Sequence, residues 1–290
     1  MVATISISMN IEQKIIAGCQ PVSGKKIIHT APHHDDILLG YFPYVQSHLV
    51  DNEHHVIYLT SGSNGVSDQF CAQQYRMSLS EFAMLDASEK NALKSKIRQT
   101  ESQRKWQLFV GGQVHIMHLQ ASFYAATDQE CIVDDDRRSA DIIRLVDYYK
   151  HVQPDIITVL VDEPGCGPQS HHQSAQLVMQ AIAAYQVWFV HTFGKQPDLT
   201  ILGYRNIWSS FSVEQASLII QVAEQELDCL QRIFDTCFAS QHHHRILLPT
   251  DDAYDLASCT NFGQQAVLTM RQQGALVGLD AAIFLRQLKI

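Results

Sequence analysis

Residues 26–36, KIIHTAPHHDD, decide the fold of this chain. Lys26–Ala31 is a short apolar run with β-branched residues that stops at a proline, as is typical of a buried strand. The next polar stretch, HHDD at 33–36, consists of four residues that can bind a metal or move a proton. Such side chains are costly beside a core unless they have partners. The segment therefore predicts a strand that leads into a chemically active loop.

Further strand candidates follow along the chain. HVIYLT at 55–60 and DIITVLV at 155–161 are short, β-branched and followed by polar, Gly- or Pro-containing residues. VHIMHL at 114–119 and DLTIL at 198–202 have the same character in weaker form. Together with Lys26–Ala31 they predict five strands.

Helical patterns separate these strands. Apolar residues recur at helical spacing in four segments, of which the last is the clearest amphipathic helix: 79–106, 140–149, 173–184 and 213–233. Strands that alternate with helices form βαβ units, so we expect an α/β fold with a mostly parallel sheet and helices on both faces. In such sheets the ligand crevice lies beyond the carboxyl ends of the strands. The sequence shows no internal repeat, and we expect residues 1–290 to form a single domain.

The composition narrows the class of protein. The chain of 290 residues is 46% hydrophobic and carries a formal net charge of −9, which argues against nucleic-acid and anionic-membrane partners because both need a basic face. We see no signal peptide and no apolar run near the ~20 residues that span a bilayer. The seven cysteines are scattered and contain no CxxC, which favours reduced thiols. We therefore expect a cytoplasmic protein.

The spacing within the first loop suggests a metal site. His33 and Asp36 are three residues apart, so both can reach one ion if a helix begins near Asp35. Asp35 would then face the reacting water. This places one histidine and two carboxylates at the mouth of the sheet.

A second pair of histidines follows the strand at 155–161. Ser170 suits the N-cap of a helix, so His171 in the first turn would project into the same crevice, with His172 as the alternative register. Two His and one Asp leave a coordination position open, which is the catalytic arrangement for zinc, and iron suits the same ligands.

Other interpretations of these motifs stay open at this point. An isolated HHDD in a loop is most often a solvated turn, and the second His pair is what favours a metal. A dinucleotide enzyme would need Gly-x-Gly-x-x-Gly after the first strand, and a serine hydrolase would need Gly-x-Ser-x-Gly; neither occurs. Ser61 and Ser63 are therefore expected to cap backbone or contact substrate.

The ordered series of motifs resembles a known family. PHHDD at 32–36 resembles the Pro-His-Pro-Asp-Asp-Glu motif of the PIG-L/LmbE-like deacetylases, zinc enzymes with a Rossmann-like fold that remove acetyl from N-acetylglucosamine conjugates. HVIYLTSG at 55–62 is similar to the LmbE-like domains associated with glucosamine-6-phosphate deaminases, and IRQTE at 97–101 to their Ile-Arg-x-x-Glu helix. Shorter likenesses are QPD at 153–155, GPQSH at 167–171, LGYRNIW at 202–208 and CFASQ at 237–241.

The resemblance implies a function and a set of residues. It implies that His33, Asp36 and His171 bind zinc and that Asp35 is the general base. It makes Arg98, and less directly Arg205, contacts of the sugar. The expected reaction removes an acyl group, acetyl by the resemblance, from a small-molecule amino sugar or its conjugate. Relatives often assemble, so a homo-oligomer is expected.

The chain departs from the family pattern at several positions of the motifs, among them His34 in place of the second proline and Gln169 in place of an aspartate. Ile37 replaces the glutamate that closes the first motif, which removes an acceptor able to orient a ligand. Pro168 stands where many members have a histidine that stabilises the oxyanion. His34, His172 or a histidine of 242–244 could supply that imidazole. These departures motivate a second hypothesis, a descendant that binds sugar or metal without hydrolysis.

Overall fold

The computed structural model describes residues 10–108, 114–124, 135–243, 246–247 and 259–289. Its α-helices are α1 (Ile11–Gly18), α2 (Asp36–His48), α3 (Asp68–Gln74), α4 (Leu79–Met84), α5 (Ala87–Gln107), α6 (Asp135–Val152), α7 (Gln169–Phe193), α8 (Glu224–Cys237) and α9 (Phe262–Ala275). Its strands are β1 (Lys26–Ala31), β2 (Glu53–Tyr58), β3 (Val114–His118), β4 (Ile156–Leu160), β5 (Thr200–Tyr204), β6 (Leu218–Gln221), β7 (Ile246–Leu247), β8 (Cys259–Thr260) and β9 (Ala282–Gln287). The described 3-10 turns are η1 (Ser63–Gly65) and η2 (Ala239–Gln241).

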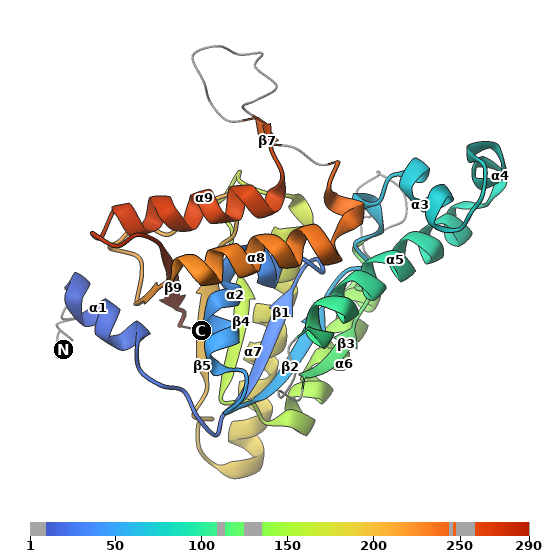
Figure 1. Ribbon diagram of the computed structural model, residues 1–290. Helices are drawn as coiled ribbons and strands as arrows, with labels where there is room; N and C mark the ends of the chain where they lie inside the picture. Colours follow the sequence, from blue (N-terminus) through green and yellow to red (C-terminus); the bar gives the residue numbers. More distant parts are fainter. Residues whose placement is uncertain (1–9, 109–113, 125–134, 244–245, 248–258, 290) are drawn as a thin grey trace.

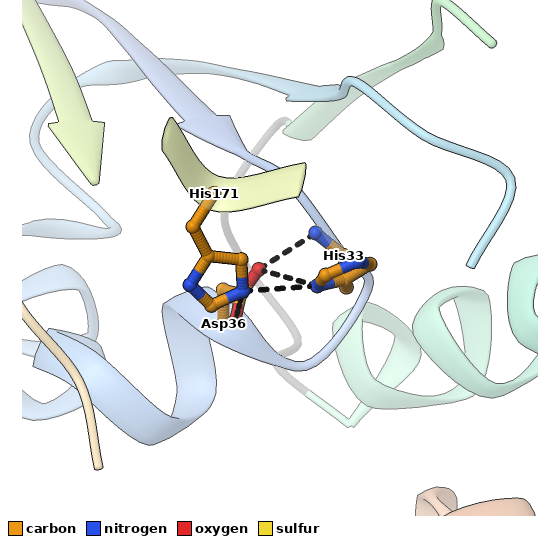
Figure 2. A group of neighbouring side chains, drawn as sticks. All are labelled: His33, Asp36 and His171. Carbon is orange, nitrogen blue, oxygen red and sulfur yellow. Dashed lines mark hydrogen bonds and ion pairs between the residues drawn. The ribbon is translucent and has the colours of Figure 1, made fainter. Parts of the chain in front are cut away.

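A seven-stranded sheet carries the fold, in the order β3-β2-β1-β4-β5-β9-β6. β1 to β5 run parallel to one another, and β9 pairs antiparallel with β5 and β6. The prediction of an α/β fold with a mostly parallel sheet is confirmed. The strand order reverses at β1, which has β2 on one side and β4 on the other, and ligands of open α/β sheets bind at such switch points. Side chains from the segments that follow β1 and β4 meet there (Figure 2).

Helices cover both faces of the sheet. Successive residues of a strand point to opposite faces, so Ile27 packs in one core with α2, α8 and α9 while Ile28 packs in another with α6 and α7. Figure 1 shows α8 and α9 crossing the near face and α7 behind the strands. Burial on both faces fits the sequence of β1, in which every residue after Lys26 is buried.

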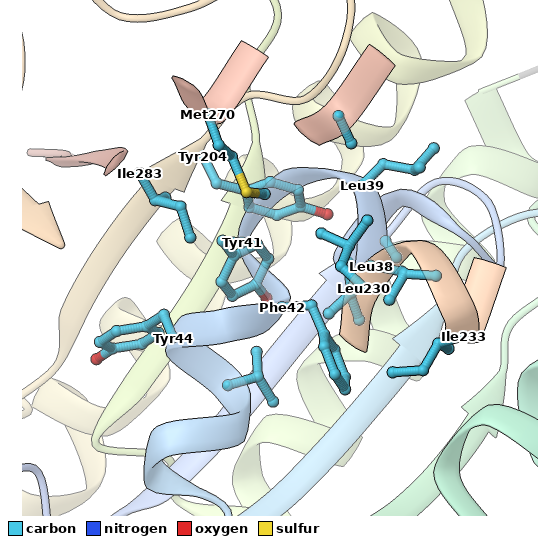
Figure 3. Packing of buried hydrophobic residues seen from close by; sticks show 14 of the residues in the cluster. Leu38, Leu39, Tyr41, Phe42, Tyr44, Tyr204, Leu230, Ile233, Met270 and Ile283 are labelled. Atoms are coloured by element: carbon cyan, nitrogen blue, oxygen red, sulfur yellow. The ribbon is translucent and has the colours of Figure 1, made fainter. Parts of the chain in front are cut away.

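The core beneath α2 fixes the helix that starts in the HHDD segment. Its aromatic rings interlock with the sheet, the rings of Tyr41 and Tyr204 lying 4.3 Å apart (Figure 3). The Tyr41 hydroxyl lies 2.6 Å from Thr158 Oγ1 of β4. Pro43 inside the helix cannot donate a backbone hydrogen bond, and the helix is bent at Tyr41, where φ is −156°. The bent helix is thereby anchored to both β4 and β5.

The segment 213–233 was predicted as one amphipathic helix, and this prediction is wrong. Its first part forms β6, and α8 begins only at Glu224. Leu218–Gln221 pairs antiparallel with β9, which lies some sixty residues further along the chain and so could not be seen in a local pattern. The partner strand overrides the local helical periodicity.

Two other predicted boundaries differ from the structure. Residues 79–106 form two helices, α4 and α5, because Asp86 caps α5: its side chain accepts a hydrogen bond from Glu89 N at 2.8 Å. Strand β2 begins at Glu53, two residues before the predicted start, since His54 is buried and hydrogen-bonded inside the sheet.

The described residues also bear on the predictions about membrane-spanning segments and cysteines. No helix among them is both long and apolar enough to cross a membrane. The cysteines whose side chains are described, Cys19, Cys71, Cys166, Cys229 and Cys237, are free thiols.

Candidate metal and substrate site

The site begins where β1 ends. The chain leaves the sheet after Ala31, and α2 starts at Asp36 with Asp35 as its N-cap residue. This confirms the helix start that the spacing of His33 and Asp36 required. Asp36 thus lies in the first turn, where the helix dipole favours a carboxylate.

The structure brings His33, Asp36 and His171 together across 138 residues of chain (Figure 2). His33 Nδ1 lies 3.1 Å from His171 Nε2 and 3.4 Å from Asp36 Oδ2. His171 Nε2 lies 3.5 Å from Asp36 Oδ1. Each residue offers one potential ligand atom, and these atoms lie within 4.8 Å of one another, the two histidines approaching different oxygens of Asp36. We call the three residues the metal triangle, and all three line a cavity.

The geometry and chemistry of this triangle fit a divalent cation. Bonds of about 2.0–2.1 Å to a tetrahedral zinc place ligand atoms roughly 3.3–3.4 Å apart, close to the separations seen here. Burial would raise the pKa of Asp36, but His171 and His33 outweigh it and lower that pKa to about 2. Asp36 is therefore an anion, and two imidazoles with one carboxylate are a ligand set that zinc and iron both accept.

Asp162, which follows β4, orients His171. Its Oδ2 lies 2.6 Å from His171 Nδ1, and because a carboxylate only accepts, the ring donates from Nδ1 and keeps Nε2 for the cavity. Burial lowers the pKa of His171, but Asp36 and Asp162 outweigh it and raise that pKa. Gly167 permits this approach: at φ 73° an added Cβ would lie 2.3 Å from Asp162 Oδ2.

Asn206 holds the other ligand side chain. Its Nδ2 donates to Asp36 Oδ1 at 2.9 Å, from the loop that follows β5. Sequence analysis missed both Asp162 and Asn206 as functional residues. The signal that could have found them was their position in the segments that follow predicted strands, Asp162 directly after 155–161 and Asn206 four residues after 198–202, at the same edge of the sheet as His33.

Asp35 is held by a buried arginine. Arg98 Nη2 donates to Asp35 Oδ1 at 2.7 Å, and Arg98 Nη1 donates to Glu101 Oε2 at 3.1 Å. Glu101 in turn accepts from the backbone N of Ser240 at 2.7 Å. This joins the IRQTE and CFASQ motifs into one support for Asp35. Burial, which outweighs the opposing pull of Arg98, raises the pKa of Glu101.

Two buried polar atoms beside the cavity have no hydrogen-bond partner among the described residues: Arg98 Nε and His34 Nδ1. Both lie next to Gly62, where an added Cβ would be 3.2 Å from Arg98 Nε and 3.1 Å from His34 Nδ1. Gly62 has φ 63° and lines the cavity. A glycine therefore leaves these atoms near the space that a ligand can enter.

His34 lies below the cavity rather than in its wall. The ring is fully buried, stacks on Tyr58 at 4.5 Å and places Nε2 3.3 Å from His118 Nδ1. Burial lowers the pKa of His34 well below its ordinary value, so the ring is neutral. Its predicted role near the oxyanion stays a prediction.

The remaining predicted residues lie outside the metal triangle. His172 Nε2 is 2.9 Å from the carbonyl of Cys166, so His171 rather than His172 faces the triangle. Arg205 donates to the carbonyls of Val161 and Ser210 and does not line the cavity, so its contact with sugar stays a prediction. The predicted N-cap role of Ser170 is wrong.

Pro168 is the N-cap of α7: its own backbone is extended, with φ −65° and ψ 147°, and the ring of proline favours such a φ. Ser170 instead lies in the first turn, with its hydroxyl 3.1 Å from His33 Nε2. In the 242–244 segment, His242 lies 6.0 Å from the Phe234 ring and does not line the cavity, and His244 is outside the described residues. Ser61 and Ser63 bond to each other, with hydroxyls 2.9 Å apart.

A second group of potential ligands, Glu53, His55 and His115, lies at the amino ends of β2 and β3. Both ring nitrogens of His55 already have partners, Glu53 Oε1 at 2.8 Å and the Tyr148 hydroxyl at 2.9 Å. The rings of His55 and His115 stack, with an angle of 20° between them. Stacked rings do not aim their nitrogens at a common ion, so the first group is the better metal site.

The cavity above the first group has a volume of about 300 Å³. It is lined by the potential ligands and Asp35, by polar groups from η1, α5 and η2, and by apolar side chains from α2, α9 and the loop after β5. Pockets for small molecules have this character, with a few placed polar groups in a largely apolar wall. Fold and site together define a Rossmann-like α/β protein with a His₂Asp group at its switch point.

The chain belongs to the PIG-L family, because the family model described as GlcNAc-PI de-N-acetylase matches residues 28–182. The resemblance inferred from the motifs is thereby confirmed. The match includes both loops that supply the metal triangle. A search of curated proteins gives no significant match.

Solved structures show the same fold at low sequence identity. The hydratase GalB from Pseudomonas putida KT2440, which acts on 4-carboxy-2-hydroxymuconate, has a TM-score of 0.60 at 15% identity over 92% of this chain and 97% of its own. The N,N'-diacetylchitobiose deacetylase from Pyrococcus horikoshii has 0.54 at 17% identity, covering 91% and 84%. A zinc-inhibited form of teicoplanin deacetylase has 0.53 at 12% identity, covering 90% and 97%.

Proposed function

We propose that this chain is a metal-dependent hydrolase that removes an acyl group, acetyl first of all, from an N-acylated amino sugar. The observation that carries the proposal is the triangle of His33, Asp36 and His171 beside the buried Asp35. The fold alone does not select this reaction, since a hydratase shares it. Family membership supports de-N-acylation over other reactions of the fold.

His33 Nδ1, an Asp36 oxygen and His171 Nε2 would hold zinc, with iron as the alternative. A divalent ion bound there supplies Lewis acidity to water and to the acyl carbonyl. Asn206 and Asp162 keep two of these ligands in place, because they hydrogen-bond to Asp36 and His171. This support stands in for the glutamate that Ile37 replaces.

Asp35 is the proposed general base. Its carboxylate lines the cavity next to the ligands, and the hydrogen bond from Arg98 Nη2 holds its Oδ1 in place. It accepts a proton from the attacking water and returns it to the departing amine. Among the described residues Arg98 Nε has no hydrogen-bond partner beside Gly62, and we assign this N–H as the contact of Arg98 with the sugar or acyl oxygen.

The test combines metal content with acetate release from a panel of N-acetylated sugars. Asp35→Asn should retain the metal and lose about 10²–10⁴-fold in turnover. His171→Ala should lose both metal and activity. His172→Ala is the matched control, because this neighbouring imidazole lies outside the triangle, and it should keep both.

Two results would contradict the proposal at different points. Full activity of the metal-loaded Asp35→Asn protein would show that Asp35 is not the base. A wild-type protein that binds metal and sugar but releases no acetate would favour the non-catalytic descendant.

A further inference from the structure

One part of the cavity wall is aromatic and apolar. Leu39, Ile207, Trp208 and Phe262 line it from α2, the loop after β5 and the start of α9. The rings of Trp208 and Phe262 meet edge to face, 5.9 Å apart at 70°. Trp208 is 37% exposed although it is a large apolar side chain. An aromatic pair that is packed yet open to solvent is suited to cover an apolar ligand group.

The position of this wall relative to the metal triangle is fixed. Trp208 lies two residues after Asn206, whose Nδ2 donates to Asp36, and Trp208 N also approaches Asn206 Oδ1 at 3.4 Å. The separation between the metal triangle and the aromatic pair is therefore set by the protein. A sugar whose amide lies at the triangle would place its substituents against the same two rings.

The charged groups of the cavity exclude one class of amino sugar. Among the lining residues that the structure describes, Arg98 is the sole lysine or arginine, and its two Nη groups pair with Asp35 and Glu101. Asp35 and Asp36 add two carboxylates to the wall. A phosphate carries about −1.5 to −2 charges at pH 7 and needs cationic partners when it leaves water. With a divalent ion bound at the triangle, the two charges of the ion and the one of Arg98 are balanced by the carboxylates of Asp35, Asp36 and Glu101, so these groups leave no net positive charge for a phosphate. The Arg98 Nε–H, unpaired among the described residues, is the donor assigned above to the sugar or acyl oxygen.

We propose that the substrate is an uncharged glycoside of an N-acylated amino sugar, with an apolar aglycone that binds against Trp208 and Phe262. The inference rests on the proposed function and narrows it. Sugar phosphates and nucleotide-linked sugars are excluded by the charges, and the aromatic pair selects the apolar group. Trp208 is thereby a specificity-determining residue.

The experiment uses three probes: methyl N-acetyl-β-glucosaminide, 4-nitrophenyl N-acetyl-β-glucosaminide and N-acetylglucosamine 6-phosphate. Binding is measured by calorimetry on zinc-loaded Asp35→Asn protein, so that no probe is consumed, and kcat/KM for acetate release is measured on the wild type. The nitrophenyl glycoside should bind about tenfold more tightly than the methyl glycoside. The phosphate should bind most weakly.

Variants of the wall then test Trp208 itself. In the Asp35→Asn background, Trp208→Ala should remove most of the nitrophenyl preference, and Trp208→Phe should restore most of it. Phe193→Ala is the matched control, since Phe193 is similarly exposed at 47% and lies outside the cavity. It should leave the preference unchanged. Circular dichroism checks that each variant is folded.

The outcomes separate this inference from the proposed function. Tighter binding of the phosphate, no binding of any probe, or a nitrophenyl preference that survives Trp208→Ala would overturn the inference. If the predicted binding order holds but the wild type releases no acetate, the hydrolase proposal fails and the specificity of the site stands. Acetate released fastest from the phosphate would support the hydrolase and refute the specificity.

Discussion

At the scale of single residues, two buried ionisable side chains, Asp162 and Lys105, differ in whether they have a charged partner. Asp162 is fully buried and turns the His171 ring by accepting from Nδ1. Lys105 of α5 is fully buried too, and among the described residues it forms no ion pair. Asp162 orients a ligand of the proposed metal, whereas the buried ammonium of Lys105 destabilises the folded state.

Removing the acceptor for His171 should weaken metal binding. Asp162→Ala leaves the imidazole free to rotate and to change tautomer, so we expect a 10–100-fold loss in zinc affinity, measured by competition with a chelator. Asp162→Asn keeps an acceptor oxygen and should lose less. Equal affinity in Asp162→Ala and the wild type would show that packing alone orients His171.

Replacing Lys105 by methionine should stabilise the protein. Burial lowers the pKa of Lys105 to about 7, although its ammonium lies 4.4 Å from the Trp106 ring centre. The unfolded chain binds that proton up to about pH 10. The cost is therefore fully present below pH 7 and fades as the pH rises towards 10.

We expect Lys105→Met to gain about 1–3 kcal/mol at pH 7 in urea unfolding, with a smaller gain at pH 9.5. Lys105→Arg is the control, because it keeps a buried charge and should not gain stability. A methionine variant less stable than the wild type at pH 7 would mean that the aromatic rings outweigh the desolvation.

At the scale of elements, the junction of α4 and α5 shows how a short local signal places a helix. Asp86 and Glu89 form reciprocal bonds, the Asp86 N to Glu89 Oε2 distance being 2.9 Å. The sequence Asp-Ala-Ser-Glu therefore starts α5 inside a stretch that carries helical periodicity throughout. Correct placement of α5 matters because it carries Arg98 and Glu101 to Asp35.

Loss of this cap should destabilise the protein measurably. Asp86→Ala removes the acceptor for Glu89 N and should cost about 1 kcal/mol in unfolding free energy. Asp86→Ser keeps a capping oxygen and should cost less than half of that. If Asp86→Ala unfolds at the wild-type urea concentration, the break between the helices is set by tertiary packing instead.

At the scale of the whole molecule, buried histidines make stability depend on pH. Hydrogen bonds run through the sheet from the Tyr41 hydroxyl to His29 Nδ1 at 2.8 Å and from His29 Nε2 to His54 Nδ1 at 2.8 Å. Burial is the leading cause that lowers the pKa of each of these histidines: His29, His34, His54, His55 and His118. His171 has a raised pKa and acts in the opposite direction.

The metal-free protein should lose stability in acid. Below about pH 6.5 the histidines of the unfolded chain become protonated, whereas the buried histidines of the folded protein stay neutral because their pKa values are lowered. Each such histidine therefore lowers the free energy of unfolding by up to about 1.4 kcal/mol per pH unit. Five groups against one give a net loss between pH 7 and 5. Urea unfolding at pH 7.5, 6.5 and 5.5 measures this loss of stability. A stability that rises towards pH 5.5 would show that the buried histidines do not have lowered pKa values.

The sequence by itself determined the parts of this protein that depend on neighbours in the chain. Lys26–Ala31 gives the first strand because its short run of β-branched and small residues can be buried on both faces of a sheet. The spacing of His33 and Asp36 lets both reach one ion when α2 begins at Asp36. The family resemblance is encoded in the same short motifs. Predictions of a single domain, a cytoplasmic location and an oligomer were made from sequence and stay predictions.

Only the tertiary structure decided which distant groups meet. β6 is a strand because β9 pairs with it, Asp162 and Asn206 serve the metal triangle because the strands before them end at one edge, and Arg98 reaches Asp35 because α5 packs against that edge. None of these contacts can be predicted from the hydrophobic periodicity of the sequence. The partners lie between 9 and 170 residues apart in the chain, and only the folded sheet with its helices brings them to hydrogen-bonding distance.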